Sequence, residues 1–160
     1  MENFGAYYLY PAVLYASNKP YFIKTILGSC IAVCIWDNNL HIGGMCHYML
    51  PYWNGNGLAS PKYGNIAIEK LHKKMLGFGS KRKNLKAKVF GGGEVLDVEN
   101  SYFQIGKRNI IIAKEVLKEI KIQVISSSVG GKLGRKIIFN TQTGEVKQRF
   151  LKTNLNPKIL

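Results

Sequence analysis

The chain has 160 residues, of which 46% are hydrophobic and 20% are charged, and its formal net charge is +14. This length favours a single domain spanning residues 1–160, and the composition excludes a disordered chain. The positive charge predicts attraction to an acidic partner. The lysines are spread along the chain without an arginine-rich tail or a nucleic-acid motif, so we favour an acidic protein, or a simply solvated lysine-rich surface, over nucleic acid.

Three cysteines, at positions 30, 34 and 46, lie within seventeen residues of one another. An odd number of closely spaced cysteines is typical of reduced thiols rather than of a disulfide framework. There is no recognisable secretory signal, and the longest apolar run, residues 26–36, is too short to span a bilayer. We therefore expect a soluble cytoplasmic protein with no membrane insertion.

The first half of the chain predicts mainly strands. Residues 1–20, rich in tyrosine, are expected to form a strand or an arm ahead of the core. Residues 31–36 are apolar and β-branched, the turn residues 37–39 follow, and residues 40–48 resume the apolar pattern, which predicts a β-hairpin. A loop is expected over residues 51–62. Asn65 then caps a predicted helix whose apolar face comprises Ile68, Leu71, Met75 and Phe78.

The second half adds another helix and more strands. A strand over residues 86–90 leads into a tight turn at Gly91-Gly92-Gly93. A helix follows Gly106, with an apolar stripe formed by Ala113, Val116, Leu117 and Ile120. Strands are expected over residues 123–129, 136–140 and 145–150, the last two joined by a turn at 141–144. Hairpins combined with helices predict an α+β fold built on a mixed sheet.

The chemistry of the chain centres on Gly28-Ser29-Cys30 and on His47, seventeen residues further on. A histidine that accepts the thiol proton makes a cysteine an effective nucleophile, and the predicted hairpin brings these two residues side by side. Gly28 permits a tight turn, and backbone amides near Ser29 and Cys30 are candidate donors to an oxyanion. The alternative interpretation of Cys30 is a small buried hydrophobic residue, the usual environment of a free cysteine.

Other residues have simpler interpretations. Cys34 is expected in the core, and Cys46 is expected to face away from His47 because successive strand residues face opposite sides. His41 and His72 are expected at the surface. A zinc site formed by the three cysteines and His47 is an alternative, but its spacing does not match a zinc knuckle. The three glycines at 91–93 lack the sequence of a phosphate-binding loop and are interpreted as a tight turn.

Several segments, in order, resemble the CheD family of chemoreceptor glutamine deamidases. They are Thr25-Ile-Leu-Gly-Ser-Cys-Ile-Ala-Val-Cys-Ile-Trp-Asp37, Gly43-Gly-Met-Cys-His-Tyr-Met-Leu-Pro51, Lys62-Tyr-Gly-Asn-Ile-Ala67, Ala87-Lys-Val-Phe-Gly-Gly92, Ile105-Gly-Lys-Arg-Asn109, and Gly130-Gly-Lys-Leu-Gly-Arg-Lys136 with Asn140-Thr-Gln-Thr-Gly144. Together they span roughly residues 21–148.

The resemblance implies an enzyme that hydrolyses glutamine side-chain amides on methyl-accepting chemotaxis receptors, and that also removes receptor methyl esters. It places the nucleophile at Cys30, the histidine at His47 and a third catalytic residue at Thr25. It also implies a compact α+β sandwich related to bacterial toxin deamidases, and binding to a CheC-type phosphatase. A non-catalytic adaptor for that phosphatase and a basic nucleic-acid-binding domain are the alternative functions.

Further expectations concern the surroundings of this site. Arg135 is a candidate for docking an acidic receptor helix, with a structural role as the alternative. Gly91 and Gly92 are candidate substrate-binding residues beside the pocket, and shaping the turn there is the favoured interpretation. We expect neither a metal nor a cofactor.

Overall fold

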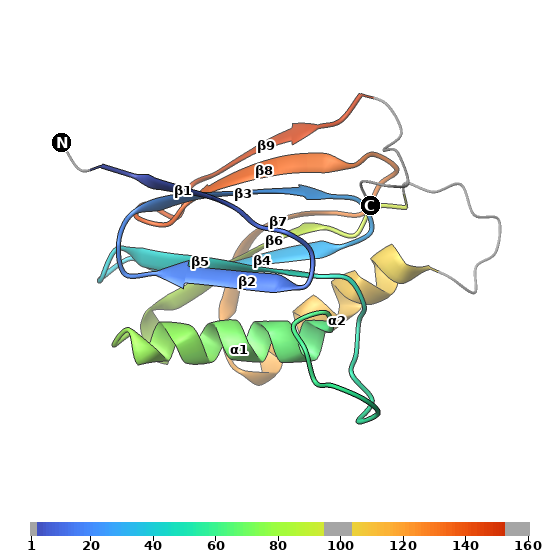
Figure 1. Cartoon of the computed structure of the whole chain (residues 1–160), viewed down its shortest axis with the longest axis horizontal. Helices are drawn as coiled ribbons and strands as arrows, with labels where there is room; N and C mark the ends of the chain where they lie inside the picture. The colour runs from blue at the N-terminus through green and yellow to red at the C-terminus, as the bar shows by residue number, and fades with distance from the viewer. Residues whose placement is uncertain (1–2, 95–103, 153–160) are drawn as a thin grey trace.

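The computed structural model describes residues 3–94 and 104–152. These residues form three layers, a four-stranded sheet, a five-stranded sheet and a pair of helices (Figure 1). The first sheet has the order β1-β3-β8-β9, from Gly5–Tyr8, Tyr21–Leu27, Arg135–Asn140 and Val146–Phe150. The second has the order β2-β5-β4-β6-β7, from Val13–Ser17, Ile42–Tyr48, Ile31–Asp37, Leu85–Gly91 and Gln123–Val129.

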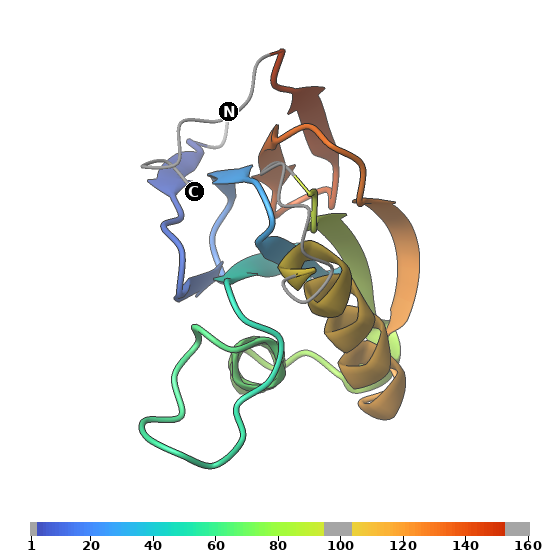
Figure 2. The ribbon, with the colours of Figure 1, turned by 90° about the vertical axis from the view of Figure 1, so that its right-hand side faces the viewer.

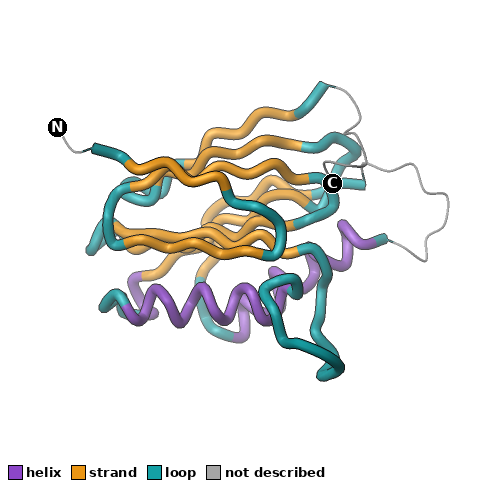
Figure 3. The backbone as a smooth tube through the Cα atoms, viewed as in Figure 1, coloured by secondary structure: helices purple, strands orange, loops and turns teal. Residues whose placement is uncertain are grey.

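Both helices lie on one side of the five-stranded sheet. Helix α1 spans Gly64–Gly77, helix α2 spans Ile105–Glu119, and a short 3₁₀ helix, Arg82–Asn84, precedes β6. Figure 2 shows the two helices beneath the five-stranded sheet, on the side opposite the four-stranded sheet. Figure 3 shows the resulting segregation of helices and strands into layers.

Each sheet combines parallel and antiparallel pairs. In the first, β1 pairs with β3 in parallel, and the remaining pairs are antiparallel. In the second, only the β6–β7 pair is parallel. The predicted α+β class is therefore confirmed, and in place of the single mixed sheet expected from the hairpins the chain forms two mixed sheets, with both helices beside one of them.

The central strands β4 and β5 of the five-stranded sheet are buried on both faces, whereas the edge strand β7 is largely exposed, and this burial explains the unbroken apolar run of β4. Its residues Ile31, Val33 and Ile35 pack toward the helices, in a core that includes Leu71 and Met75 of α1. The alternate side chains face the other sheet, in a second core that includes Ile23 and Phe139. A strand covered on both sides needs apolar residues at every position, so it shows no polar alternation.

The predicted hairpin is confirmed as β4 and β5. Asp37 closes its turn, because the Asp37 Oδ1 accepts hydrogen bonds from the backbone N–H groups of Asn39 and Leu40, at 2.8 and 3.1 Å. The antiparallel register pairs Ala32 with His47 and Ile31 with Tyr48. This register fixes which side chains of the two strands share a face.

The ends of the first helix differ from the sequence prediction. Asn65 does not cap α1; the N-cap position is Tyr63, and the Asn65 Oδ1 instead accepts a hydrogen bond from the Trp53 backbone N–H at 2.9 Å. Phe78 lies at the C-cap and is 36% exposed, so it does not belong to the buried face. The N-terminal residues form β1 and β2, one in each sheet, where a single strand or an arm was expected.

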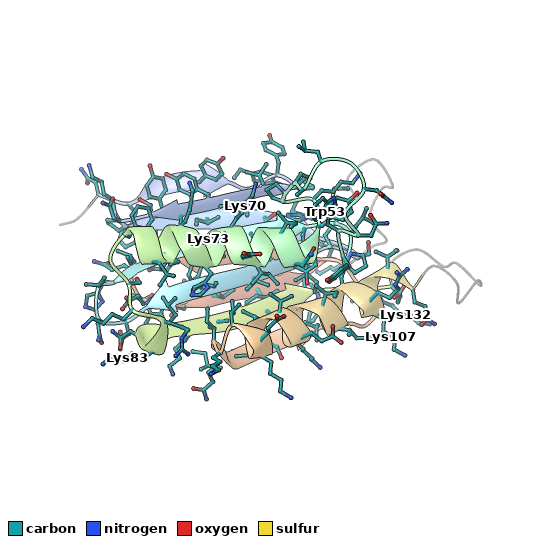
Figure 4. All side chains as sticks on the ribbon, turned by 90° about the horizontal axis from the view of Figure 1, so that it is seen from below. Trp53, Lys70, Lys73, Lys83, Lys107 and Lys132 are labelled. Atoms are coloured by element: carbon teal, nitrogen blue, oxygen red, sulfur yellow. The ribbon has the colours of Figure 1, made fainter. Side chains whose placement is uncertain are left out.

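The lysines cover the helical side of the molecule without forming one cluster. In Figure 4 the labelled Lys70, Lys73, Lys83, Lys107 and Lys132 are distributed over the whole of that side. Within the described residues, neither helix has the length and apolar character needed to cross a membrane.

Candidate active site

Cys30 and His47 lie on the face of the five-stranded sheet that is covered by the other sheet. Ala32 is paired with His47, and Cys30, two residues before Ala32, shares its face. Cys30 directly precedes β4 and is therefore placed diagonally to His47, on the face that both side chains share. In the described structure the two side chains are not hydrogen-bonded, and the His47 Nε2 is buried without a partner.

Thr25 reaches His47 from the opposite sheet. The inward-facing residues of β3 are Ile23, Thr25 and Leu27, all fully buried. The Thr25 Oγ1 lies 2.7 Å from the His47 Nδ1 and 2.7 Å from the Leu9 carbonyl oxygen. The carbonyl can only accept, so the Thr25 hydroxyl donates its single proton to Leu9 and accepts one from His47.

This chain of hydrogen bonds fixes the tautomer of the imidazole. The proton of neutral His47 sits on Nδ1, and the unpartnered Nε2 presents its lone pair. A histidine held in this way is oriented as a general base. Thr25 thus has the geometry of a residue that orients the imidazole.

Burial keeps both members of the Cys30–His47 pair uncharged at rest. It raises the pKa of the Cys30 thiol to about 11, against a weaker opposing effect of the residue's own backbone N–H. It lowers the pKa of His47 to about 4, opposed by the Leu9 carbonyl. The resting pair is therefore a thiol and a neutral imidazole, so proton transfer must accompany attack on a substrate.

The turn that carries Cys30 is held by its three consecutive carbonyl groups. The Gly28 oxygen accepts from the Gly93 N–H at 2.9 Å, and the Cys30 oxygen accepts from the Gly92 N–H at 2.9 Å. The Ser29 oxygen accepts from the Asn109 side-chain amide at 3.0 Å. Among the described residues, no hydrogen bond is donated by the backbone N–H of Ser29 or Cys30. The Ser29 N–H, and the Cys30 N–H beside its own thiol, are therefore candidate donors to an oxyanion.

Gly91 and Gly92 pack against the turn that carries Cys30. A Cβ atom on Gly91 would lie 2.2 Å from the Cys30 carbonyl oxygen, and the φ of Gly91 is +109°. Gly92 has a φ of +69°, and a Cβ atom on it would lie 2.5 Å from the Ile110 Cγ1 of α2. Both contacts require glycine, and they agree with the interpretation that these residues shape the turn.

Arg135 is internal and does not form part of an exposed docking surface. It is 1% exposed, and its guanidinium donates hydrogen bonds to the Ser128 and Gly130 carbonyl oxygens. The Phe150 ring lies 5.0 Å from the guanidinium carbon. These contacts match the structural role that the sequence left open as the alternative.

The remaining cysteines and histidines lie as follows. Cys34 is buried between the sheets, and Cys46 faces the helices, on the side opposite His47, as predicted. His41 is exposed, as predicted, whereas His72 is partly buried and burial lowers its pKa. Within residues 3–94 and 104–152, no three histidine, cysteine or acidic residues are grouped so that they could hold a metal ion.

Two contributors to this site were not assigned a role from the sequence. The Leu9 carbonyl is a backbone group and leaves no sequence signal. Asn109 is fully buried and occupies the same face of α2 as Ile112, Ala113 and Val116. A polar residue on an apolar helical stripe is the signal that marks it.

Comparison with known proteins gives a consistent family. Residues 49–150 match the family described as CheD chemotactic sensory transduction. Three similar proteins, each named "Probable chemoreceptor glutamine deamidase CheD", come from Trichlorobacter lovleyi, Sulfurimonas denitrificans and Rhodospirillum rubrum. They are 48%, 42% and 39% identical to this chain, over 88%, 90% and 91% of its length and 87%, 93% and 82% of their own.

The family match begins after His47, so the arrangement of Thr25, Cys30 and His47 is an observation separate from it. The relatives, in contrast, match nearly the whole chain at high identity. On these grounds the chain belongs to the CheD family.

Proposed function

We propose that this protein is a cysteine-dependent deamidase that converts glutamine side chains of methyl-accepting chemotaxis receptors to glutamate. The observation that carries the proposal is the hydrogen-bond chain from the Leu9 carbonyl through Thr25 to His47, on the face that Cys30 shares. The names of the relatives supply the substrate class.

The proposed reaction begins when the Cys30 Sγ attacks the amide carbon of the glutamine side chain. The His47 Nε2 takes the thiol proton. The backbone N–H groups of Ser29 and Cys30 donate hydrogen bonds to the amide oxygen and stabilise the negative charge that develops on it. The protonated His47 then gives its proton to the nitrogen, the C–N bond breaks, and ammonia leaves a thioester on Cys30.

Water completes the proposed cycle. His47 accepts a proton from the water that attacks the thioester carbon, the C–S bond breaks, and the glutamate product and the Cys30 thiol are released. Thr25 holds the imidazole in one orientation throughout, because its hydroxyl accepts from Nδ1. The same steps apply to a glutamate methyl ester, with methanol in place of ammonia.

The positive charge of the chain suits the proposed partner. A net charge of +14 favours encounter with an acidic helical receptor surface. Binding to a CheC-type phosphatase, a cytoplasmic location and kinship with toxin deamidases also belong to the proposal. They follow from the family resemblance. A non-catalytic adaptor of that phosphatase is the second candidate, because it needs the fold but not the thiol.

The decisive experiment compares Cys30→Ala with Cys34→Ala. Receptor and enzyme are co-incubated in water labelled with heavy oxygen, and receptor peptides are analysed by mass spectrometry. We expect labelled glutamate from the wild type and from Cys34→Ala, which changes only a buried cysteine between the sheets. Deamidation that persists in Cys30→Ala would overturn the thioester mechanism. Its absence from the wild type would favour the adaptor.

A further inference from the structure

Asn109 joins the two chain segments that carry Cys30 and His47. Its side-chain Nδ2 donates to the Ser29 carbonyl oxygen and to the Met49 carbonyl oxygen, both at 3.0 Å. Ser29 directly precedes Cys30, and Met49 lies two residues after His47. The two protons of one amide group therefore bridge the start of β4 and the end of β5.

The position of Asn109 makes this bridge rigid. The residue is fully buried on α2, and its own backbone carbonyl accepts a hydrogen bond of 2.6 Å from the Tyr48 hydroxyl. Helix α2 is thus tied to the end of β5 by main-chain and side-chain contacts. Burial in a low-dielectric setting strengthens both side-chain hydrogen bonds and makes their loss costly.

The bridge acts where the β4–β5 ladder ends. The strands pair up to Ile31 and Tyr48, and neither Ser29 nor Met49 belongs to a strand. The Met49 N–H is directed elsewhere, to the Lys62 carbonyl at 2.9 Å. Beyond the last ladder pair, the hydrogen bonds of the Asn109 amide therefore set the spacing between the Ser29 and Met49 segments in the described part of the chain.

We propose that Asn109 is a positioning residue that holds the Cys30 turn at a fixed separation from the His47 strand. We expect no contact between Asn109 and the substrate, because its side chain is fully buried beneath the two segments. Within residues 3–94 and 104–152, its buried Oδ1 has no hydrogen-bond partner. This inference rests on the proposed function for its kinetic readout, but the reactivity of Cys30 tests it independently.

The kinetic test uses Asn109→Ala, with Asn109→Ser as a milder variant that keeps one hydroxyl donor. We expect kcat for receptor deamidation to fall by about 10- to 100-fold in Asn109→Ala, because small displacements of reacting groups cost rates of this order. KM should stay near the wild-type value. An unchanged kcat in a folded Asn109→Ala would overturn the proposal.

The matched control is Asn140→Ala. The Asn140 Oδ1 also binds two backbone groups, the N–H groups of Gln142 and Thr143, at 2.9 and 3.2 Å. It lies at the other end of the β3–β8 pair, where it is paired with Phe22 rather than with Leu27. This variant is expected to lower Tm while leaving kcat unchanged.

A second readout does not require the receptor. The alkylation of Cys30 by iodoacetamide is followed by peptide mapping across a range of pH, with the fully buried Cys34 as an internal reporter of general opening. Burial holds the Cys30 pKa high in the wild type. In Asn109→Ala the Cys30 turn loses its bridge to the His47 strand. Cys30 should then react with iodoacetamide several times faster than in the wild type at neutral pH, while the reaction rate of Cys34 stays unchanged.

The outcomes separate the two proposals. If the alkylation rates of Cys30 and Cys34 rise together, the protein has opened generally and the positioning role is overturned. Failure of both Asn109 variants to fold would overturn it as well. A wild type without deamidase activity would refute the proposed function, while the selective change in Cys30 reactivity would still support the positioning role.

Discussion

Replacing Thr25 with valine tests the hydrogen-bond chain most directly. The two side chains have nearly the same shape, but valine can neither accept from the His47 Nδ1 nor donate to the Leu9 carbonyl. Thr25 is fully buried, so water cannot replace the lost hydroxyl. The variant therefore leaves one buried donor and one buried acceptor without partners.

The magnitude follows from these two groups. A buried polar group that loses its partner costs about 1–3 kcal/mol, so the free energy of unfolding should fall by about 2–6 kcal/mol. For a domain of this size, that corresponds to a Tm lower by roughly 5–20 °C. Loss of the contact that orients His47 removes about 1.5–3 kcal/mol of transition-state stabilisation, which is about 10- to 100-fold in kcat.

The assay measures Tm by calorimetry and the kinetics of receptor deamidation by mass spectrometry, below the Tm of the variant. KM should not change, because a fully buried Thr25 cannot contact the substrate. Thr25→Ser keeps the hydroxyl and is the control, with kcat expected within a few-fold of the wild type. A Thr25→Val enzyme with wild-type kcat would refute the role assigned to this hydroxyl.

Two further predictions concern the same site. Burial lowers the pKa of His47 from 6.5 to about 4, so between these values the unfolded chain binds more protons than the native protein. The free energy of unfolding should therefore fall by up to about 3 kcal/mol as the pH is lowered through this window. Urea titrations across the window should show this dependence in the wild type and less of it in His47→Gln; equal dependence in both would contradict the assignment. Gly91→Ala should lower both Tm and kcat, because its Cβ would clash with the Cys30 carbonyl, whereas Gly55→Ala, with a similar φ of +97° and no neighbour within 4 Å, suffers only backbone strain of about 1–2 kcal/mol. Equal losses in the two glycine variants would show that contact with the Cys30 turn is unimportant.

Local patterns predicted most of the secondary structure. Apolar, β-branched runs separated by turn residues located β4, β5, β6 and the C-terminal strands, and the helical stripes located α1 and α2. The ends of elements were less accurate, as with Asn65, because a capping side chain can instead bind a neighbouring loop. The family resemblance implied a sandwich, but which strands form each sheet was not predicted, since pairing between distant strands leaves no local periodicity.

The sequence by itself determined that Cys30 and His47 share one face and that Cys46 takes the other. A hairpin with a defined turn sets its own register, and strand residues alternate with a period of two. Only the tertiary structure decided how His47 is held. Its partner Thr25 lies on a different sheet, the Leu9 carbonyl is a backbone group, and Asn109 comes from a helix sixty residues beyond Met49. These contacts depend on how sheets and helix stack, and layer stacking is set by the packing of whole cores rather than by the spacing of residues along the chain.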